Sequence, residues 1–223
     1  MNSLIGDSRV RNLKHGPLRS VIQDNWCTPG AKIADMESLV RDCVIMHHGE
    51  DTYDGKLHIY ISAGICNMTK RIKGHNYEET IFDLNYHHRT LANIIEELNN
   101  IQRFTLRENA VPVFCTIYPL SLRVWNHTRL SQNKTTYLKF EEDYETMQVN
   151  LECHLIQINN HIFSLNKSLN MSTPDLANQI KHKRSKGKYS LKLNWLVDGC
   201  HPGSQLKNSI QVSIAQAIAK NRK

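Results

Sequence analysis

Short apolar runs alternate with long segments of helical periodicity along this chain, and this alternation constrains the fold most. The run at 56–64, KLHIYISAG, has the β-branched and aromatic content of a buried parallel strand. The run at 111–119, VPVFCTIYP, has the same character, and shorter runs at 4–5 and 20–26 indicate two earlier strands. Parallel strands need long crossover connections, so the pattern predicts an α/β fold with a mostly parallel sheet and helices on both faces.

The segments between these strands carry apolar residues at helical spacing. Helices are therefore predicted at 9–15, 33–44, 77–104, 136–161, 171–180 and from about 203 onward. The segment 189–195, YSLKLNW, is either a last short strand or an extended approach to Asp198. With 223 residues and no internal repeat or clear linker, residues 1–223 are expected to form a single domain.

Composition narrows the class of protein. Apolar residues make up 40% of the chain and charged residues 22%, with no run of 18 or more apolar residues, so no membrane span is expected. The start, MNSLIGDS, lacks the features of a signal peptide. The six cysteines include no CxxC pair, which favours reduced, buried thiols. A cytoplasmic location, with a nuclear one as the alternative, is the expectation.

The positive charge is concentrated in one place. The net charge is +7 with a pI near 9.1, which permits attraction to nucleic acid, anionic lipid or acidic substrates without establishing any of them. Five basic residues gather in the segment 181–190, and they are Lys181, Lys183, Arg184, Lys186 and Lys188. This segment is either a solvated loop or a patch that contacts phosphate or nucleic acid.

In a parallel α/β sheet the ligand site lies beyond the carboxyl ends of the strands, so the residues that follow each strand are the candidates. The first strand is followed by Gly6-Asp7-Ser8. Alone, these residues are typical of a turn and a helix cap. The alternative is that Ser8 is a nucleophile, which requires a base elsewhere in the chain.

The stretch WLVDGCHPGS near the other end either supplies that base or is only a turn and a helix cap. Asp198 and His201 are three residues apart, with Gly199 between them and Gly203 after them, a spacing at which the carboxylate can reach the Nδ1 atom of the imidazole. Nε2 is then free to accept the proton of a serine hydroxyl. An oxyanion would also need donors, and the candidates are the backbone N–H of Ser8, a backbone N–H near Gly30 and the side-chain amide of Asn67.

Four blocks in order, IGDSRV, the lone Gly30, AGICN and DGCHP, resemble those of the SGNH (GDSL-like) hydrolase superfamily. The chain also resembles esterase-like domains found in open reading frames of transposable elements and in related invertebrate proteins. The resemblance implies a three-layer, flavodoxin-like α/β/α sandwich with a sheet of about five parallel strands. It implies an ester hydrolase, an esterase or acetylesterase without metal or organic cofactor. It makes Ser8 the nucleophile, His201 the base and Asp198 its orienting partner, with Gly30 and Asn67 as oxyanion donors.

The chain departs from the family in the third block. The usual Gly-x-Asn-Asp is replaced by Gly64-Ile65-Cys66-Asn67-Met68, in which the gap is one residue longer and the Asp is absent. Asn67 is therefore free to point elsewhere. The alternative function is a weakly active or inactive protein of the same fold that binds an anionic ligand or nucleic acid.

The remaining candidates are side chains that have a structural interpretation beside the functional one. Arg9 either favours an anionic substrate at the edge of the site or is an exposed helix residue, and Tyr118 either lines the site or ends its strand. The pairs at 47–48 and 87–88 are adjacent histidines, which point about 100° apart on a helix and cannot hold one metal ion from one face. No metal site is expected.

Overall fold

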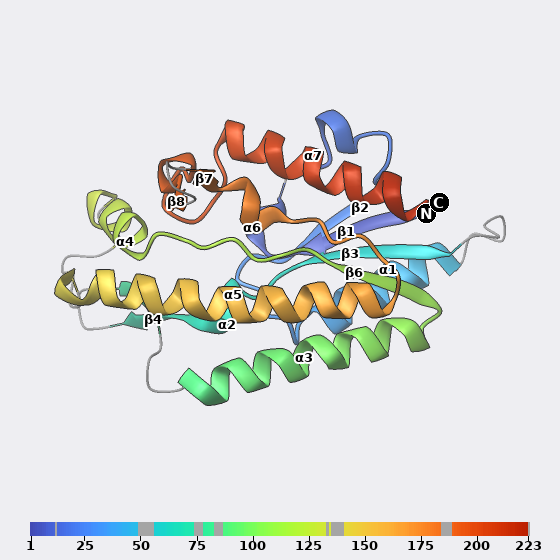
Figure 1. The fold of residues 1–223 in the computed structure, drawn as a ribbon, viewed down its shortest axis with the longest axis horizontal. Coiled ribbons are helices and arrows are strands. Elements are labelled where there is room, and N and C mark those ends of the chain that lie inside the picture. Colours follow the sequence, from blue (N-terminus) through green and yellow to red (C-terminus); the bar gives the residue numbers. More distant parts are fainter. Residues whose placement is uncertain are drawn as a thin grey trace.

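The computed structural model describes residues 1–11, 13–48, 56–73, 78–82, 87–132, 134, 141–183 and 189–222. At its centre is a parallel sheet in the order β2-β1-β3-β6. The strands are β1 (Asn2–Gly6), β2 (Asp24–Cys27), β3 (Leu57–Ser62) and β6 (Ala110–Phe114). Figure 1 shows α7 along one side of this sheet and α3 along the opposite side. The predicted α/β fold is confirmed.

The alternation of side chains along the strands builds two cores. Leu4, Tyr60 and Val113 are in register across β1, β3 and β6 and belong to one buried cluster. The next residues along the same strands, Ile5, Ile61 and Phe114, belong to the other. Successive side chains of a strand point to opposite faces, so strands that are apolar throughout need a helical layer on each side.

Four long helices form these layers: α1 (Met36–His48), α3 (His87–Arg107), α5 (Tyr144–Ser168) and α7 (Ser204–Asn221). The first three pack over one face and contribute to the cluster that contains Ile5, whereas α7 contributes to the cluster that contains Leu4. Two shorter helices, α4 (Leu122–Ser131) and α6 (Leu176–Gln179), complete the connections, together with α2 (Ile65–Met68). The helices predicted at 33–44, 77–104, 136–161, 171–180 and from about 203 are thus present, with shifted ends.

The main sheet has four strands in the described part of the chain, one fewer than expected. Beyond β6, two asparagines of α5 bind the backbone where another strand would pair. Asn166 accepts from the N–H of Phe114 at 2.9 Å and donates to its carbonyl at 2.7 Å. Asn159 does the same for Ile117, at 2.7 and 2.9 Å. The following segment contributes one backbone bond, from the Thr116 N–H to the Pro174 carbonyl.

Two local predictions are wrong. Residues 78–82, placed in the long helix, form strand β5 (Glu78–Phe82), which pairs antiparallel with β4 (Thr69–Lys73). A partner strand of matching length overrides a local helical pattern. The helix expected at 9–15 is limited to a 3₁₀ turn at Ser8–Val10. The short strand offered as one alternative for 189–195 is present as β8 (Tyr189–Leu191), which pairs with β7 (Lys181–Lys183) and not with the main sheet.

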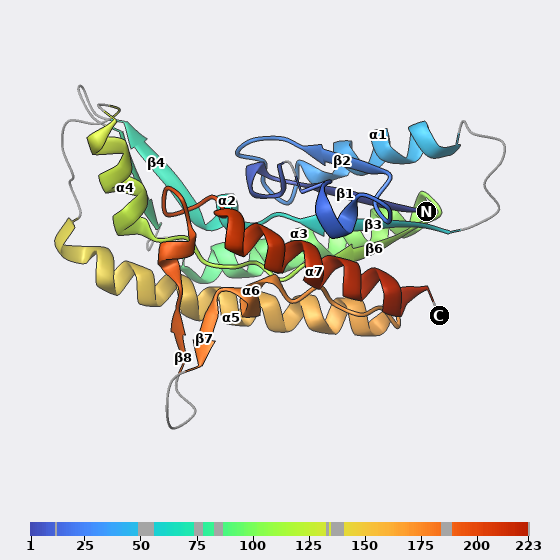
Figure 2. The same ribbon diagram turned by 90° about the horizontal axis from the view of Figure 1, so that it is seen from above.

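The basic segment lies at this second hairpin, which projects from the body of the molecule in Figure 2. Lys181 is exposed. Lys183 is placed only as a residue of β7, and Arg184, Lys186 and Lys188 lie outside the described residues. All six cysteines are free thiols. Cys43 and Cys115 are buried as expected, but Cys153 is exposed.

Candidate active site

Ser8 lies two residues after the end of β1, an inner strand of the sheet. The chain leaves the strand at Gly6, and the Asp7 carboxylate accepts the N–H of Arg9 at 2.9 Å, which caps the 3₁₀ turn that begins at Ser8. A Cβ on Gly6 would lie 2.3 Å from the carbonyl oxygen of Ser62. Only glycine therefore permits the neighbouring strand end to pack this closely, and the turn presents Ser8 at the carboxyl edge of the sheet.

Ser8, His201 and Asp198 form one chain of hydrogen bonds. Ser8 Oγ lies 3.0 Å from His201 Nε2, and His201 Nδ1 lies 2.7 Å from Asp198 Oδ2. The other carboxylate oxygen of Asp198 accepts the backbone N–H groups of Cys200 and His201, at 3.0 and 2.8 Å. The carboxylate thus fixes the turn and the ring together, and it selects the tautomer in which Nε2 is an acceptor.

The charge of Asp198 is stabilised by these contacts. Burial alone would raise the pKa of its carboxyl, but the hydrogen bonds from the His201 ring and from the two backbone amides outweigh burial. The pKa of Asp198 is therefore lower than its ordinary value of 3.8. At neutral pH the ring of His201 faces an ionised carboxylate, which is the state that stabilises an imidazolium when the ring accepts a proton.

Gly199 allows the turn that carries both residues to approach α4. Its φ angle is +82°, and its carbonyl accepts the N–H of Ser121 at 2.6 Å. A Cβ at this position would lie 2.5 Å from the N atom of Trp125 and 2.8 Å from the carbonyl oxygen of Ser121. Those atoms are backbone at the start of a helix, so they cannot move aside without displacing it.

Replacing Gly199 with alanine is therefore expected to displace His201 from Ser8 and to lower kcat about 100-fold, the cost typical of a misplacement of about 1 Å. The positive φ adds a loss of about 1–2 kcal/mol in the free energy of unfolding. Kinetics with a chromogenic ester and urea denaturation measure the two effects. Val197→Ala is the matched control, because Val197 is 74% exposed in the same turn. Unchanged activity in G199A would show that the close approach is dispensable.

The two residues whose backbone N–H groups are candidate oxyanion donors lie at one cavity. Ser8 and Gly30 both border one cavity, and the described hydrogen bonds include no acceptor for either N–H. Gly30 has a φ of +77° in the loop after β2, a conformation that glycine adopts without strain. The structure thus brings Ser8, His201 and Gly30 together.

The side chain of Asn67 forms hydrogen bonds with groups outside this cavity. Its Oδ1 accepts the N–H of Ile33 at 3.0 Å, and its Nδ2 donates to Glu97 of α3 at 2.6 Å. Burial raises the pKa of the Glu97 carboxyl, with the hydrogen bond from Asn67 acting in the opposite direction. Asn67 is not among the residues that line the cavity around Ser8. In this arrangement it ties the loop before α1 to α3.

Arg9 and Tyr118 are core residues, which corrects the prediction that Arg9 contacts substrate or is exposed on a helix and the prediction that Tyr118 lines the site. Both are 2% exposed. The guanidinium lies 4.4 Å from the centroid of the Tyr118 ring, donates to the Tyr118 carbonyl at 2.8 Å and pairs with Asp7 at 3.4 Å. Burial alone would lower the pKa of Arg9, but Asp7 and Tyr118 hold it above its ordinary value. Arg9 thereby anchors the turn of Ser8 to the segment after β6.

The cavity beside Ser8 has a volume of about 680 Å³. Trp125 of α4 borders it, with its ring centroid 6.0 Å from that of His201. Sequence reasoning missed Trp125, because α4 followed an apolar run and carried no motif. It also missed four cationic residues of the wall, and these are Arg11, Lys32, Lys70 and Arg71.

Two further predictions, that the chain has no membrane span and that its paired histidines hold no metal ion, concern features outside this cavity. Among the described residues, no helix is long and apolar enough to cross a membrane. His47 binds within the fold, since its Nε2 lies 2.8 Å from Asp24 Oδ2 and 3.2 Å from Ser3 Oγ. The side chains of His48, His87 and His88 lie outside the described part of the structure.

Comparison with known proteins shows which solved structures share the fold of this chain. No protein-family model matches the sequence, and no curated protein matches it. Solved structures do match over nearly the whole chain. A GDSL-like lipase from Bacteroides thetaiotaomicron is 11% identical, with a TM-score of 0.61 over 98% of this chain and 87% of that one. The acetyl xylan esterase AlAXEase is 12% identical, with a TM-score of 0.53 over 98% and 99%.

A third structure, a member of the lipolytic G-D-S-L family from Veillonella parvula, is 11% identical, with a TM-score of 0.50 over 98% of each chain. These chains share an architecture with the present one at sequence identities that leave few positions in common. The fold of this protein is therefore that of the GDSL-like, or SGNH, hydrolases. The resemblance drawn from four short sequence blocks is confirmed at the level of the fold.

Proposed function

We propose that this protein is a serine hydrolase that cleaves ester bonds, with Ser8 as nucleophile and His201 and Asp198 as its base and orienting partner. The observation that carries the proposal is the continuous chain of contacts from Ser8 Oγ through His201 to Asp198, at 3.0 and 2.7 Å. These three residues come from opposite ends of the sequence, so a turn or a helix cap does not explain why they meet. The esterases among the structural neighbours support the same class of reaction.

In this mechanism Ser8 Oγ attacks the ester carbonyl while its proton passes to His201 Nε2. The C–O π bond of the carbonyl breaks, and the resulting oxyanion accepts hydrogen bonds from the N–H groups of Ser8 and Gly30. Collapse of the intermediate breaks the bond to the alcohol, which leaves with the proton held by His201. A water molecule then hydrolyses the acyl-serine by the same two steps, and the acid is released.

Asn67 is left out of this proposal as an oxyanion donor, because its amide and carbonyl are engaged with Glu97 and Ile33. Loss of one donor typically lowers the rate by about 100-fold or more, so we expect a slow enzyme in this conformation. Rotation of Asn67 away from Glu97 would be required for it to act as a third donor.

A fluorophosphonate probe tests the proposal, because it labels serines that are activated by a base. The folded protein is expected to be labelled at Ser8, as mapped by peptide mass spectrometry, and Ser8→Ala is expected to abolish labelling. Ser38→Ala is the matched control, since Ser38 is exposed on α1 and its Oγ donates only to the Asp35 carbonyl. Labelling that survives in S8A would rule out Ser8 as the nucleophile.

The second candidate function is a protein of the same fold that binds an anionic ligand or nucleic acid without turnover. The engagement of Asn67 by Glu97 favours it, because it removes a donor that a fast hydrolase would use. This candidate predicts no labelling of Ser8 and, for nucleic acid, a binding affinity that falls steeply as salt is raised. Binding that is insensitive to salt would exclude the nucleic-acid version.

A further inference from the structure

The wall of the cavity beside Ser8 is strongly cationic. Four basic side chains border it, and they come from different elements: Arg11 after the nucleophile turn, Lys32 before α1, and Lys70 and Arg71 on β4. The described residues that line the cavity include no acidic side chain. Figures 1 and 2 show how this arises, since β4 and α4 lie together at the end of the sheet toward which β1 and β3 run.

Two of these cations, Arg71 and Lys32, also lie close to other groups that border the cavity. Arg71 lies 5.6 Å from the centroid of the Trp125 ring, which borders the same cavity and is itself close to His201. Burial and Asp7 raise the pKa of the Cys66 thiol in the cavity wall, while Arg9, Arg71 and Lys32 act in the opposite direction without offsetting them. Arg71 and Lys32 thus lie close enough to this wall for their charge to act on it.

Such a site favours one class of substrate. A concave surface lined by charge of one sign focuses the electric field and raises the local concentration of oppositely charged ligands. Four cations around a nucleophile, with no acidic group in the described lining, would attract an anion to the reacting centre. A neutral substrate would gain nothing from this attraction, and a cationic one would be repelled.

We infer that the substrate of this hydrolase is an ester that carries a negatively charged group next to the scissile bond, held by Arg11, Lys32, Lys70 and Arg71. This inference rests on the proposed function and specifies its substrate class. The anionic group could belong to the acyl part or to the alcohol part of the ester. In both cases the cations bind a charge that is present before and after the reaction, so they act mainly on KM and on the rate of association.

The test compares matched esters that differ in charge. Phenyl acetate is the neutral reference, its para-sulfonate places the charge on the alcohol side, and phenyl hemisuccinate places it on the acyl side. Phenyl hemisuccinate and phenyl acetate share phenol as the leaving group and are compared directly, whereas the rate with the para-sulfonate is corrected by the ratio of the rates at which hydroxide hydrolyses it and phenyl acetate. One of the two anionic esters is expected to have a corrected kcat/KM about tenfold or more above that of the neutral ester. That preference should shrink as sodium chloride is raised to about 0.5 M, because salt screens exposed charges.

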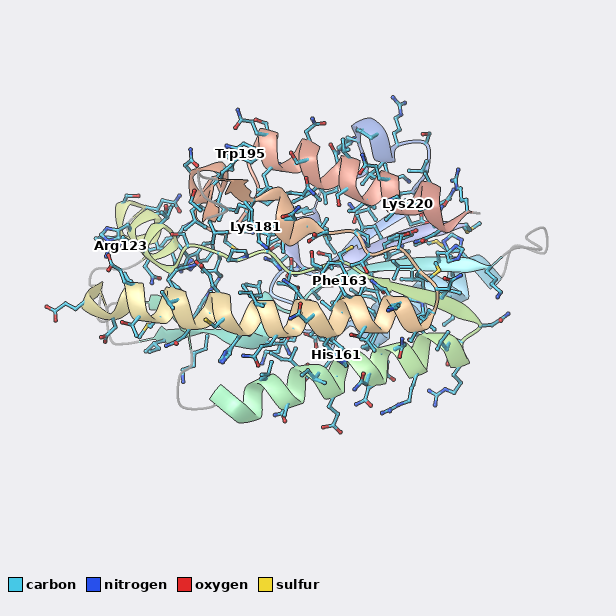
Figure 3. The ribbon with its side chains drawn as sticks, viewed as in Figure 1. Arg123, His161, Phe163, Lys181, Trp195 and Lys220 are labelled. Atoms are coloured by element: carbon cyan, nitrogen blue, oxygen red, sulfur yellow. The ribbon has the colours of Figure 1, made fainter. Side chains whose placement is uncertain are left out.

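A variant lacking two of the cations, Arg11→Gln with Lys32→Gln, assigns the effect to the cavity wall. It is expected to reduce the preference for the anionic ester by roughly tenfold, largely through KM. The matched control is Arg19→Gln with Lys220→Gln, which removes the same charges from exposed positions outside the cavity. Lys220 lies toward the end of the molecule opposite Arg123 in Figure 3. The control should keep the preference of the unaltered protein.

The outcomes separate the two proposals. Equal corrected rates for all three esters would overturn the inference about charge and leave the hydrolase standing. A preference that is the same in the R11Q/K32Q variant and in the unaltered protein would also overturn it, since the charge of these two side chains would not be responsible. If none of the esters is hydrolysed, the proposed function and the inference fail together.

Discussion

Replacing His201 with glutamine is expected to lower kcat for ester hydrolysis by about 10⁴-fold or more. The reason is that Ser8 Oγ has His201 Nε2 as its acceptor at 3.0 Å, and a glutamine amide cannot take up the proton. The serine would then attack as a neutral hydroxyl, which is a weak nucleophile. Saturation kinetics with a chromogenic ester measures kcat, and urea denaturation checks that the variant is folded.

The control for this variant is His161→Gln. His161 lies on α5, where Nε2 is 2.9 Å from Asn99 Oδ1, and it is not among the residues that border the cavity. Figure 3 labels it on the side of the molecule where α5 and α3 meet. H161Q should keep the kcat of the unaltered protein. If H201Q kept it as well, the hydrogen bond from Ser8 to His201 would have no part in catalysis.

Replacing Asp198 with asparagine is expected to reduce kcat by about 10⁴-fold, although the side chain keeps its size. The carboxylate accepts three hydrogen bonds: two backbone N–H groups reach Oδ1, and the His201 ring reaches Oδ2. An asparagine has only one acceptor oxygen, so either the turn or the Nδ1–H group of His201 loses its partner. In the second case the ring can rotate or adopt the tautomer in which Nε2 carries the proton. The kcat of D198N gives the size of the effect.

The same substitution has a signature in stability. The pKa of Asp198 is lowered in the folded protein, so its ionised form stabilises the fold above its ordinary pKa of 3.8, and this contribution is lost as the pH falls through the lower folded value. The difference in the free energy of unfolding between the unaltered protein and D198N should therefore be largest above pH 3.8 and shrink in more acidic solution. Asp143→Asn is the control, because Asp143 is exposed and makes no side-chain capping bond. A difference that does not change with pH would show that the carboxylate is not stabilised by folding.

Much of the fold could be predicted from local patterns, since each of the runs around Leu4, Ile59 and Val113 is apolar on both faces and so requires a sheet covered on both sides. The hairpin of β4 and β5 could not be predicted, because Glu78–Phe82 by itself has a helical pattern. It forms a strand only through its pairing with Thr69–Lys73. Pairing of this kind depends on contacts between segments and leaves little trace in either segment alone.

The candidate site likewise has residues that could be predicted from the sequence and contacts that could not. Ser8, Asp198 and His201 could be selected because short motifs carry them, and each motif dictates its own local turn. The contacts of Asn67 and Arg9 could not be predicted, because the partner of each is distant in the sequence. Asn67 binds Glu97, and Arg9 lies over the ring of Tyr118. The cationic wall is also a property of the assembled fold, since Arg11 and Arg71 come to border the same cavity only when β4 is placed beside the end of the sheet.

The two asparagines of α5 have a consequence beyond the count of strands. An outer strand with free amides and carbonyls is a template on which another chain can add a strand and begin aggregation. Here the amides and carbonyls of Phe114 and Ile117 are already bound by Asn166 and Asn159. Both side chains are buried, so an incoming strand would have to displace the helix before it could pair. On this side, then, α5 protects the protein against self-association through its sheet.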